Sequence, residues 1–358
     1  MKSTIGLLLI LGSLLLPAIL TAQSTPQVAL LALSKRGHTL AIVDPASLKV
    51  VAKVPVGNDP HEVIASSDGK TAYVSNYGGG AFNTLAVIDL VGQTALPSVD
   101  LGALRGPHGL VFVGGKTWFT AEAAKAIGSY DPATKKIDWI LGTGQNRTHM
   151  IWVSDDLQRI VTTNVKSGTV SIIEKSAAHA PAGPPPGTPD RPNDAQGPPP
   201  VPPPGAPGGD WDQTVVRVGD GSEGFDVSPD GKEVWVANAR DGSISILDLP
   251  AKKVTQTLAA GLRGANRLKF TPDGKRVFVS SLGGPDVAVF DSASRKEIKR
   301  IPVGHGAAGI EMQPDGTRVY VACTPDNYVA VIDLNSLEVI GRIDVGLQPD
   351  GLAWAVRQ

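Results

Sequence analysis

Three of the six histidines stand at equivalent positions of a repeated sequence pattern and could therefore share one site. They are His61, His108 and His149, and the next repeat carries Glu223 at the same position. Neutral imidazoles and a carboxylate suit Zn²⁺, Cu²⁺, Fe²⁺ or Mn²⁺, and three protein ligands with one open position would suit catalysis. We predict a divalent-metal site here, with the metal left open. The alternative is that the histidines cap strands and bind water.

Two glutamates next to this position could supply a general base. Glu62 follows His61 directly, and Glu122 ends a strand of the following repeat. A carboxylate close to a metal-bound water can take its proton, so both glutamates are candidate catalytic residues. The sequence offers no persuasive nucleophile motif, phosphate loop or dense basic aromatic surface beside them.

Further polar residues could hold an anionic ligand at the same place. Arginines lie shortly before the aligned position in three repeats. In one of these repeats and in the last one, polar residues also occupy the aligned position or follow it. These candidate ligand-binding residues are Arg105, Arg147, Arg263, Asn266, Arg267 and Asp350. A guanidinium binds carboxylate or phosphate through paired hydrogen bonds. The alternative is that the arginines are solvated loop charges.

The elements that position these residues follow from the repeat. Each copy contains an apolar strand, a turn with glycine and a second apolar strand, and the clearest copies begin at Pro60, Ser222, Ala265 and Ala307. Aligned copies follow one another at 41 to 47 residues, except for one interval of 74. The long interval contains a proline-rich stretch at about 178–210. Without that stretch, the period is the roughly 40 residues of a propeller blade.

The two ends of the chain complete one repeat. A single first strand, at 351–356, ends the chain, while three strands at 28–32, 38–43 and 49–54 begin it without a first strand. Joining them gives a seventh blade and removes an open sheet edge. We predict an all-β fold, a seven-bladed β-propeller with four-stranded blades. N-terminal strands b, c and d pair with C-terminal strand a to close it.

Short sequences within the copies carry a family resemblance. The strands YVSN (73–76) and VWVAN (234–238), and the turn SPDGK (228–232), resemble the YVTN-type β-propeller repeat. The resemblance implies that strand a lies beside the central axis, so that the aligned position faces one funnel. Similar propellers include surface-layer-like proteins, a periplasmic DNA-binding protein, and relatives of lactonases and of amine dehydrogenase heavy subunits. Fold alone selects none of these functions.

The first 22 residues are predicted to be a signal peptide. Lys2 precedes an apolar run at 5–16, which small residues at 18–22 follow. The run is too short, and too soon broken by Pro17, for a membrane span. We expect the mature chain, 23–358, to be periplasmic or secreted and monomeric. The net charge of −1 argues against a nucleic-acid partner.

Two other features bear on stability and partners. Cys323 is the one cysteine, which excludes an intramolecular disulfide, and we expect it to be buried on a strand. The proline-rich stretch is predicted to be a disordered or semi-rigid spur between strands c and d of its blade. It could contact a protein partner, and a tolerated insertion is the alternative.

Three functions stay open at this point. The first is a binding module whose funnel holds a small ligand or metal ion. The second is a metal-dependent hydrolase or lyase, lactonase-like, that acts on a small anionic substrate. The third is a protein-interaction scaffold without catalysis.

Overall fold

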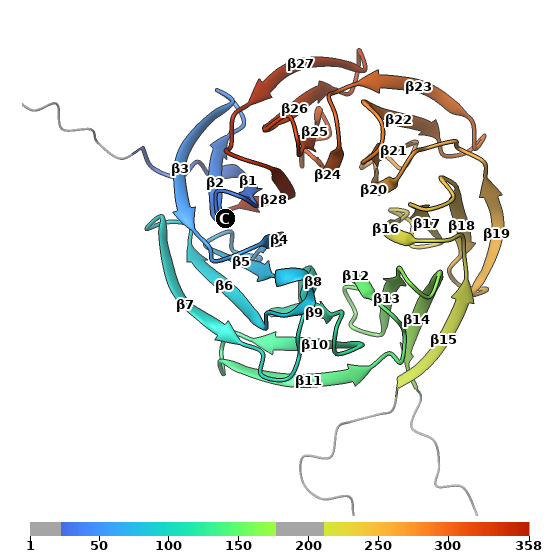
Figure 1. Ribbon diagram of the computed structural model, residues 1–358, viewed down its shortest axis with the longest axis horizontal. Coiled ribbons are helices and arrows are strands. Elements are labelled where there is room, and N and C mark those ends of the chain that lie inside the picture. The colour runs from blue at the N-terminus through green and yellow to red at the C-terminus, as the bar shows by residue number, and fades with distance from the viewer. Residues whose placement is uncertain (1–22, 177–210, 358) are drawn as a thin grey trace, which may run out of the picture.

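Seven four-stranded antiparallel sheets form a ring around a central axis (Figure 1). The computed structural model describes residues 23–176 and 211–357. The predicted all-β, seven-bladed propeller is thus confirmed. The predicted signal peptide and the proline-rich stretch lie outside the described residues. In the described ranges, the single helical element is the short η1 (Gly78–Gly80), and no helix there has the length and apolar character to cross a bilayer.

Each blade runs from strand a at the axis to strand d at the outer edge. Blade 1 consists of β28 (Pro349–Val356), β1 (Val28–Ser34), β2 (Thr39–Asp44) and β3 (Lys49–Pro55). Blade 2 consists of β4 (Pro60–Ala65), β5 (Thr71–Asn76), β6 (Thr84–Asp89) and β7 (Thr94–Asp100). Blade 3 consists of β8 (Pro107–Val113), β9 (Lys116–Ala121), β10 (Ala126–Asp131) and β11 (Lys136–Gly142). Blade 4 consists of β12 (Thr148–Val153), β13 (Arg159–Asn164), β14 (Thr169–Lys175) and β15 (Trp211–Arg217).

The remaining three blades follow the same order. Blade 5 consists of β16 (Ser222–Val227), β17 (Glu233–Asn238), β18 (Ile244–Asp248) and β19 (Lys253–Leu258). Blade 6 consists of β20 (Ala265–Phe270), β21 (Arg276–Ser281), β22 (Asp286–Asp291) and β23 (Glu297–Pro302). Blade 7 consists of β24 (Ala307–Met312), β25 (Arg318–Cys323), β26 (Tyr328–Asp333) and β27 (Glu338–Ile343).

The core lies between the faces of neighbouring blades. Strands b and c are covered on both faces, which explains why they read as nearly continuous apolar runs. For example, Leu33 of β1 lies in one buried cluster with Val74 of β5 and Ile88 of β6. Outer strands such as β7 are largely exposed. Burial between blades therefore replaces the single central core of a smaller domain.

The ring closes as the sequence predicted. β28 pairs antiparallel with β1, from Val28 opposite Val356 to Ser34 opposite Pro349. This pairing gives strand b of blade 1 a neighbour on its inner side and completes a four-stranded sheet, in which β28 is the inner edge strand. Backbone hydrogen bonds thereby join segments from the two ends of the chain.

Every strand a contains a β-bulge near its start. In blade 2, Pro60 pairs with Asn76 and Val63 pairs with Val74, which leaves one extra residue on strand a. The same one-residue shift recurs in the other six blades. A bulge re-aims the side chains beside it, and here both His61 and Glu62 line cavities on the axis.

Hydroxyl groups on strand b connect these bulges to the next blade. The Thr120 hydroxyl accepts a hydrogen bond from the Gly109 amide at 2.9 Å and donates to the His149 carbonyl at 2.7 Å. Thr163 and Ser280 make the same two kinds of contact in their own blades. One side chain thus fixes a bulge and holds the functional position of the neighbouring blade.

Replacing Thr120 by valine removes this connection without changing the side-chain shape. We expect Thr120→Val to lower the free energy of unfolding by roughly 2–4 kcal/mol, since a buried amide and a buried carbonyl lose their partner. Thr117 is the matched control, because it is equally buried on β9 and its hydroxyl has no partner among the described residues. Chemical denaturation should show Thr117→Val close to wild type, and equal losses in both variants would contradict the assignment.

The single thiol provides a test of packing. Cys323 is fully buried at the end of β25, and burial raises its pKa to about 12. Since the thiolate is the reactive form, we expect no alkylation of the native protein by iodoacetamide from pH 7 to pH 9. Mass spectrometry should detect complete alkylation in denaturant. Rapid labelling of the native protein would contradict the buried position.

Candidate functional site

A cavity of about 320 Å³ lies on the axis where the a strands begin. We call it the mouth cavity. Eight of the predicted site residues line it, namely His61, His108, Arg147, His149, Glu223, Asn266, Arg267 and Asp350. Lys35, which follows β1, also lines it and was not predicted. The bulges at the a strands therefore gather most of the predicted residues in one place.

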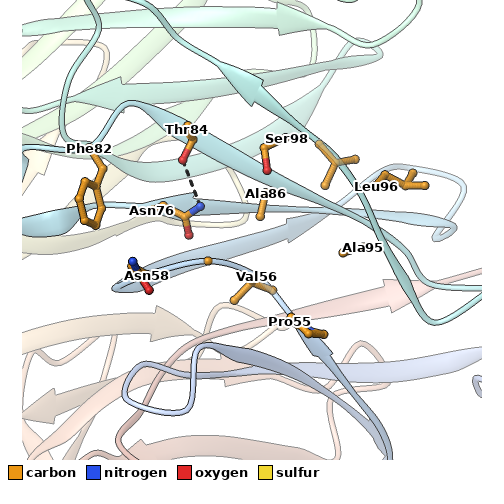
Figure 2. Close-up of a pocket in the computed structure, with 12 residues that line it drawn as sticks. Pro55, Val56, Asn58, Asn76, Phe82, Thr84, Ala86, Ala95, Leu96 and Ser98 are labelled. Atoms are coloured by element: carbon orange, nitrogen blue, oxygen red, sulfur yellow. Dashed lines mark hydrogen bonds between the residues drawn. The ribbon is translucent and has the colours of Figure 1, made fainter.

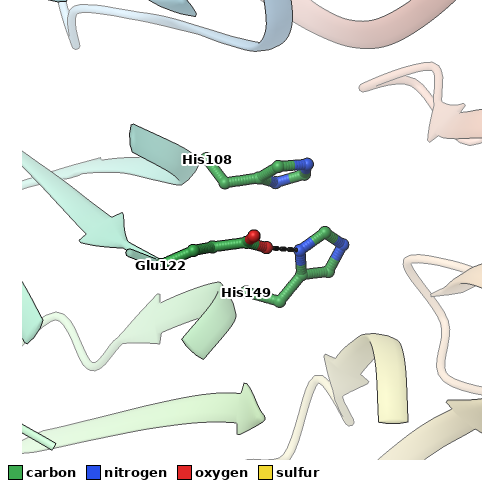
Figure 3. Close-up of side chains that lie close together, drawn as sticks. All are labelled: His108, Glu122 and His149. Carbon is green, nitrogen blue, oxygen red and sulfur yellow. Dashed lines mark hydrogen bonds and ion pairs between the residues drawn. The ribbon is translucent and has the colours of Figure 1, made fainter. Parts of the chain in front are cut away.

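Three buried side chains at this cavity could hold a metal ion. His108 comes from β8, Glu122 directly follows β9, and His149 comes from β12 (Figure 3). Their potential ligand atoms all lie within 4.8 Å of one another. The rings of His108 and His149 have centroids 3.9 Å apart. We call these residues the three-donor group. One of them, Glu122, was predicted from the sequence to be a general base.

His149 lies between two carboxylates. Its Nδ1 contacts Oε1 of Glu122, and its Nε2 lies 2.7 Å from Oε2 of Glu223. Burial disfavours the charged ring, but Glu223 and Glu122 outweigh burial and raise the pKa of His149. Conversely, burial opposes ionisation of Glu223, but His149 and Arg147 outweigh it and lower its pKa to about 2. Without a metal, the two flanking carboxylates therefore favour the protonated form of His149.

His108 has the opposite electrostatic environment. The side chain is 2% exposed, and burial together with the neighbouring positive groups holds its pKa well below 6.5. Its ring is therefore neutral at pH 7. Nδ1 of His108 has no hydrogen-bond partner among the residues that the structure describes. A neutral imidazole with an unused nitrogen is available as a metal ligand.

Glu122 uses both carboxylate oxygens. Oε1 contacts His149, while Oε2 accepts hydrogen bonds from the Tyr77 hydroxyl at 2.5 Å and from Arg147 Nε at 3.4 Å. Burial and the adjacent Glu122 raise the pKa of Tyr77 to about 12, so its hydroxyl keeps the proton that it donates. The repeat gave no role to Tyr77, although it directly follows the YVSN sequence.

Arg147 enters the site through an unusual backbone conformation. Its φ is +60°, in the left-handed region that residues other than glycine rarely adopt. Nη1 of Arg147 lies 3.3 Å from Oε1 of Glu223, and Nε contacts Glu122. One guanidinium therefore holds both carboxylates that flank His149.

His61 lies beside the three-donor group but faces other carboxylates. Its ring centroid is 4.9 Å from that of His108. Nε2 of His61 lies 3.2 Å from Asp59, and Nδ1 lies 3.7 Å from Asp350. The hydrogen bond from His61 lowers the pKa of Asp59 to about 2. Lys35 contacts Asp350 at 3.2 Å, which completes this side of the mouth cavity.

A buried ion pair separates the mouth cavity from a second cavity. Nη2 of Arg267 lies 2.5 Å from Oε1 of Glu62, and both side chains are 12% exposed. Glu62 and Arg267 also line a cavity of about 330 Å³ farther along the axis, whose other charged lining residues are Asp226, Lys269 and Glu311. Glu62, the second predicted catalytic residue, therefore forms an ion pair with Arg267.

Glycines occupy the position that corresponds to Glu62 and Arg267 in blades 3 and 5. A Cβ on Gly109 would lie 2.5 Å from the His149 carbonyl oxygen, and one on Gly224 would lie 2.4 Å from that of Asn266. Side chains at these two positions are excluded by the next blade. Glu62 and Arg267 project toward the axis at the corresponding positions of blades 2 and 6.

The charges of the site do not balance. The charged side chains of the site are Lys35, Arg147 and Arg267 against Asp59, Glu62, Glu122, Glu223 and Asp350. If all three histidines are neutral, the site carries two excess negative charges, and a proton on His149 reduces this excess to one. One divalent cation or two protonated imidazoles would neutralise it.

Two predicted arginines lie elsewhere. Arg105 and Arg263 are both exposed, and neither lines the two axial cavities. They precede the a strands of blades 3 and 6, as Arg147 does in blade 4. Their outward placement separates them from the three-donor group.

A groove at the outer side of blades 1 and 2 has fewer side chains that could bind a metal ion or an anion. Its volume is about 380 Å³, and Val56, Asn76 and Leu96 are among its lining residues (Figure 2). None of the side chains that line it is charged. Asn76 donates to the Thr84 hydroxyl at 3.2 Å, so its amide serves the fold. The mouth cavity is therefore the stronger candidate site.

Comparisons with known proteins agree with the fold. The model of the YNCE-like beta-propeller family matches residues 209–312. No curated protein matches the chain significantly. A functionally unknown protein from Desulfotomaculum acetoxidans is 14% identical with a TM-score of 0.70, and the match covers 92% of this chain and 99% of that one.

Other solved structures have different names. A Bacteroides uniformis protein described as "a putative 6-phosphogluconolactonase" is 14% identical with a TM-score of 0.67, over 91% of this chain and 99% of that one. Hydrazine synthase from Kuenenia stuttgartiensis is 16% identical with a TM-score of 0.62, over 82% of this chain and 89% of that one. At such identities these likenesses establish the fold alone.

The ion pairs of Glu223 give the metal-free protein a defined response to acid. Because the folded pKa of Glu223, about 2, lies below its ordinary value of 4.5, its ionisation stabilises the fold above about pH 4.5. This contribution, roughly 3 kcal/mol at most, is lost as pH falls from 4.5 toward 2.

We therefore expect the stability difference between wild type and Glu223→Gln to shrink over that range. Urea denaturation in the presence of a chelator at pH 6, 4.5 and 3 measures it. Glu233→Gln, in the same blade but outside the site, is the control. A difference for Glu223→Gln that is constant with pH would contradict the assignment.

Proposed function

We propose that this YVTN-like β-propeller repeat protein binds one divalent metal ion at the mouth of its axis. His108, Glu122 and His149 would be the protein ligands. The observation that carries the proposal is the burial of these three donors together, with Nδ1 of His108 lacking a partner among the described residues. A buried polar atom without a partner costs free energy unless a ligand completes it.

The surroundings of His149 fit a metal ligand. The ion would take the place of the hydrogen that Nδ1 of His149 now shares with Glu122. Glu223 lies 2.7 Å from Nε2 without hydrogen-bond geometry, so its carboxylate would have to realign to orient a metal-bound imidazole. Tyr77 and Arg147 would keep Glu122 in position through its other oxygen.

Charge supports the same conclusion. Once the ion has displaced the proton of His149, the site carries two excess negative charges, which one divalent cation would balance. Two imidazoles and one carboxylate are a ligand set found for Zn²⁺ and for other first-row transition metals, so the identity of the ion is left to experiment.

Binding is better supported than catalysis. A free carboxylate beside a metal-bound water would support general-base catalysis. Both oxygens of Glu122 are engaged, and Glu62 is paired with Arg267. The lactonase name belongs to a protein that is 14% identical, so it adds no argument for hydrolysis here. Export and a protein partner for the proline-rich stretch stay predictions from the sequence.

Metal titration tests the proposal. We expect calorimetry with Zn²⁺ to give one site per chain in the chelator-treated protein, and elemental analysis to give one ion per chain after loading. The double variant His108→Ala and His149→Ala should lose at least about 100-fold in affinity, since it loses two ligands. His305→Ala, an exposed histidine next to Asp326, is the control. Unchanged binding by the double variant would overturn the proposal.

A further inference from the structure

The wall of the mouth cavity has a different charge balance from the site as a whole. Asp59, Glu62 and Glu122 belong to the site but do not line this cavity. Its lining contains the three permanent cations, Lys35, Arg147 and Arg267, and only two carboxylates, Glu223 and Asp350. Each of these two carboxylates already contacts a cation. The open space of the cavity is thus surrounded by an excess of positive charge, which a bound metal ion would increase.

Arg267, which lines both the mouth cavity and the second cavity, has an unused donor. Its Nη2 is bound to Glu62, while Nη1 has no hydrogen-bond partner among the described residues. Leaving a buried guanidinium nitrogen unpaired is costly. Asn266 precedes it on β20, lines the same cavity and is 7% exposed. A ligand with two adjacent oxygen atoms could bind the guanidinium nitrogen and the amide together.

This wall is close to the three-donor group. Oε1 of Glu62 lies 2.5 Å from Nη2 of Arg267 and 4.0 Å from Nδ1 of His108. One carboxylate oxygen therefore separates the guanidinium from a proposed metal ligand. Figure 1 shows β20 across the axial opening from β8 and β12. A molecule in the mouth cavity could contact the ion and Arg267 together.

We propose that the mouth cavity binds a short dicarboxylate, with one carboxylate at the open coordination position of the metal and the other at Arg267 and Asn266. This inference rests on the proposed metal site, because three protein ligands leave a position open. The cavity, about 320 Å³, has the volume of about ten water molecules at roughly 30 Å³ each, which suits a chain of this size.

Titration of metal-loaded and metal-free protein with succinate tests the inference, and succinamide serves as the uncharged probe. We expect succinate to bind the loaded protein, with affinity at least about tenfold lower without metal, since one end then loses its partner. Succinamide should not bind measurably. Elemental analysis of each sample reports whether metal is present.

Variants locate the second carboxylate. Asn266→Ala should weaken succinate binding about tenfold, because it removes one donor and leaves no charge unpaired. The double variant Glu62→Gln and Arg267→Gln removes the ion pair as a unit and should weaken binding further. Arg263→Gln is the matched control, as an exposed arginine that precedes the same strand.

The outcomes separate the two proposals. A protein that holds one metal ion but does not bind succinate overturns the dicarboxylate inference and leaves the metal site in place. A protein that binds no metal overturns both. Equal weakening by Arg263→Gln and by the Asn266 variant would indicate unspecific attraction by charge and would overturn the inference.

Discussion

The β-bulge at the start of each strand a is the constraint on which the site depends. In a regular strand, neighbouring side chains point to opposite faces, so only every second residue could reach the axis. The bulge places two successive residues there, as with His61 and Glu62. The strand-b hydroxyls of Thr120 and Thr163 then bind the bulge to the backbone of the next blade. The same contacts therefore join neighbouring blades and hold the side chains of the site in position.

Electrostatics determine how the site can be used. Five carboxylates pair with three permanent cations and with the histidines, and these surroundings raise the pKa of His149 but lower that of His108. Three of the five carboxylates do not line the mouth cavity, whereas all three cations do. This layering favours a cation among the donors and an anion in front of it. A simple count of acidic and basic residues would miss the distinction.

The sequence was sufficient for the fold and for much of the site. The period of the repeat predicted the blades, their closure, and the convergence of the three histidines with Glu223, because equivalent positions in a ring face one axis. The prediction grouped Arg147 with Arg105, although their positions in the repeat differ. Arg147 lies two residues before the aligned position, where blade 3 has Gly106, whereas Arg105 lies three residues before it. Tyr77 and Lys35 were missed although the repeat carries a signal for them, because each directly follows a strand b, as Glu122 does. Glu122 was predicted as a base, and its actual neighbours depend on side-chain contacts between blades 2, 3 and 4.

The pairing of β28 with β1 also has a consequence for biogenesis. Blade 1 needs residues from both ends of the chain, so the ribosome must finish 349–356 before that sheet can be assembled. Until then the inner edge of β1 is open and can pair with other strands. The histidines come from blades 2, 3 and 4, which are synthesised much earlier. Assembly of the proposed metal ligands could thus precede closure of the ring, and an ion bound by them at that stage would stabilise a partly built protein.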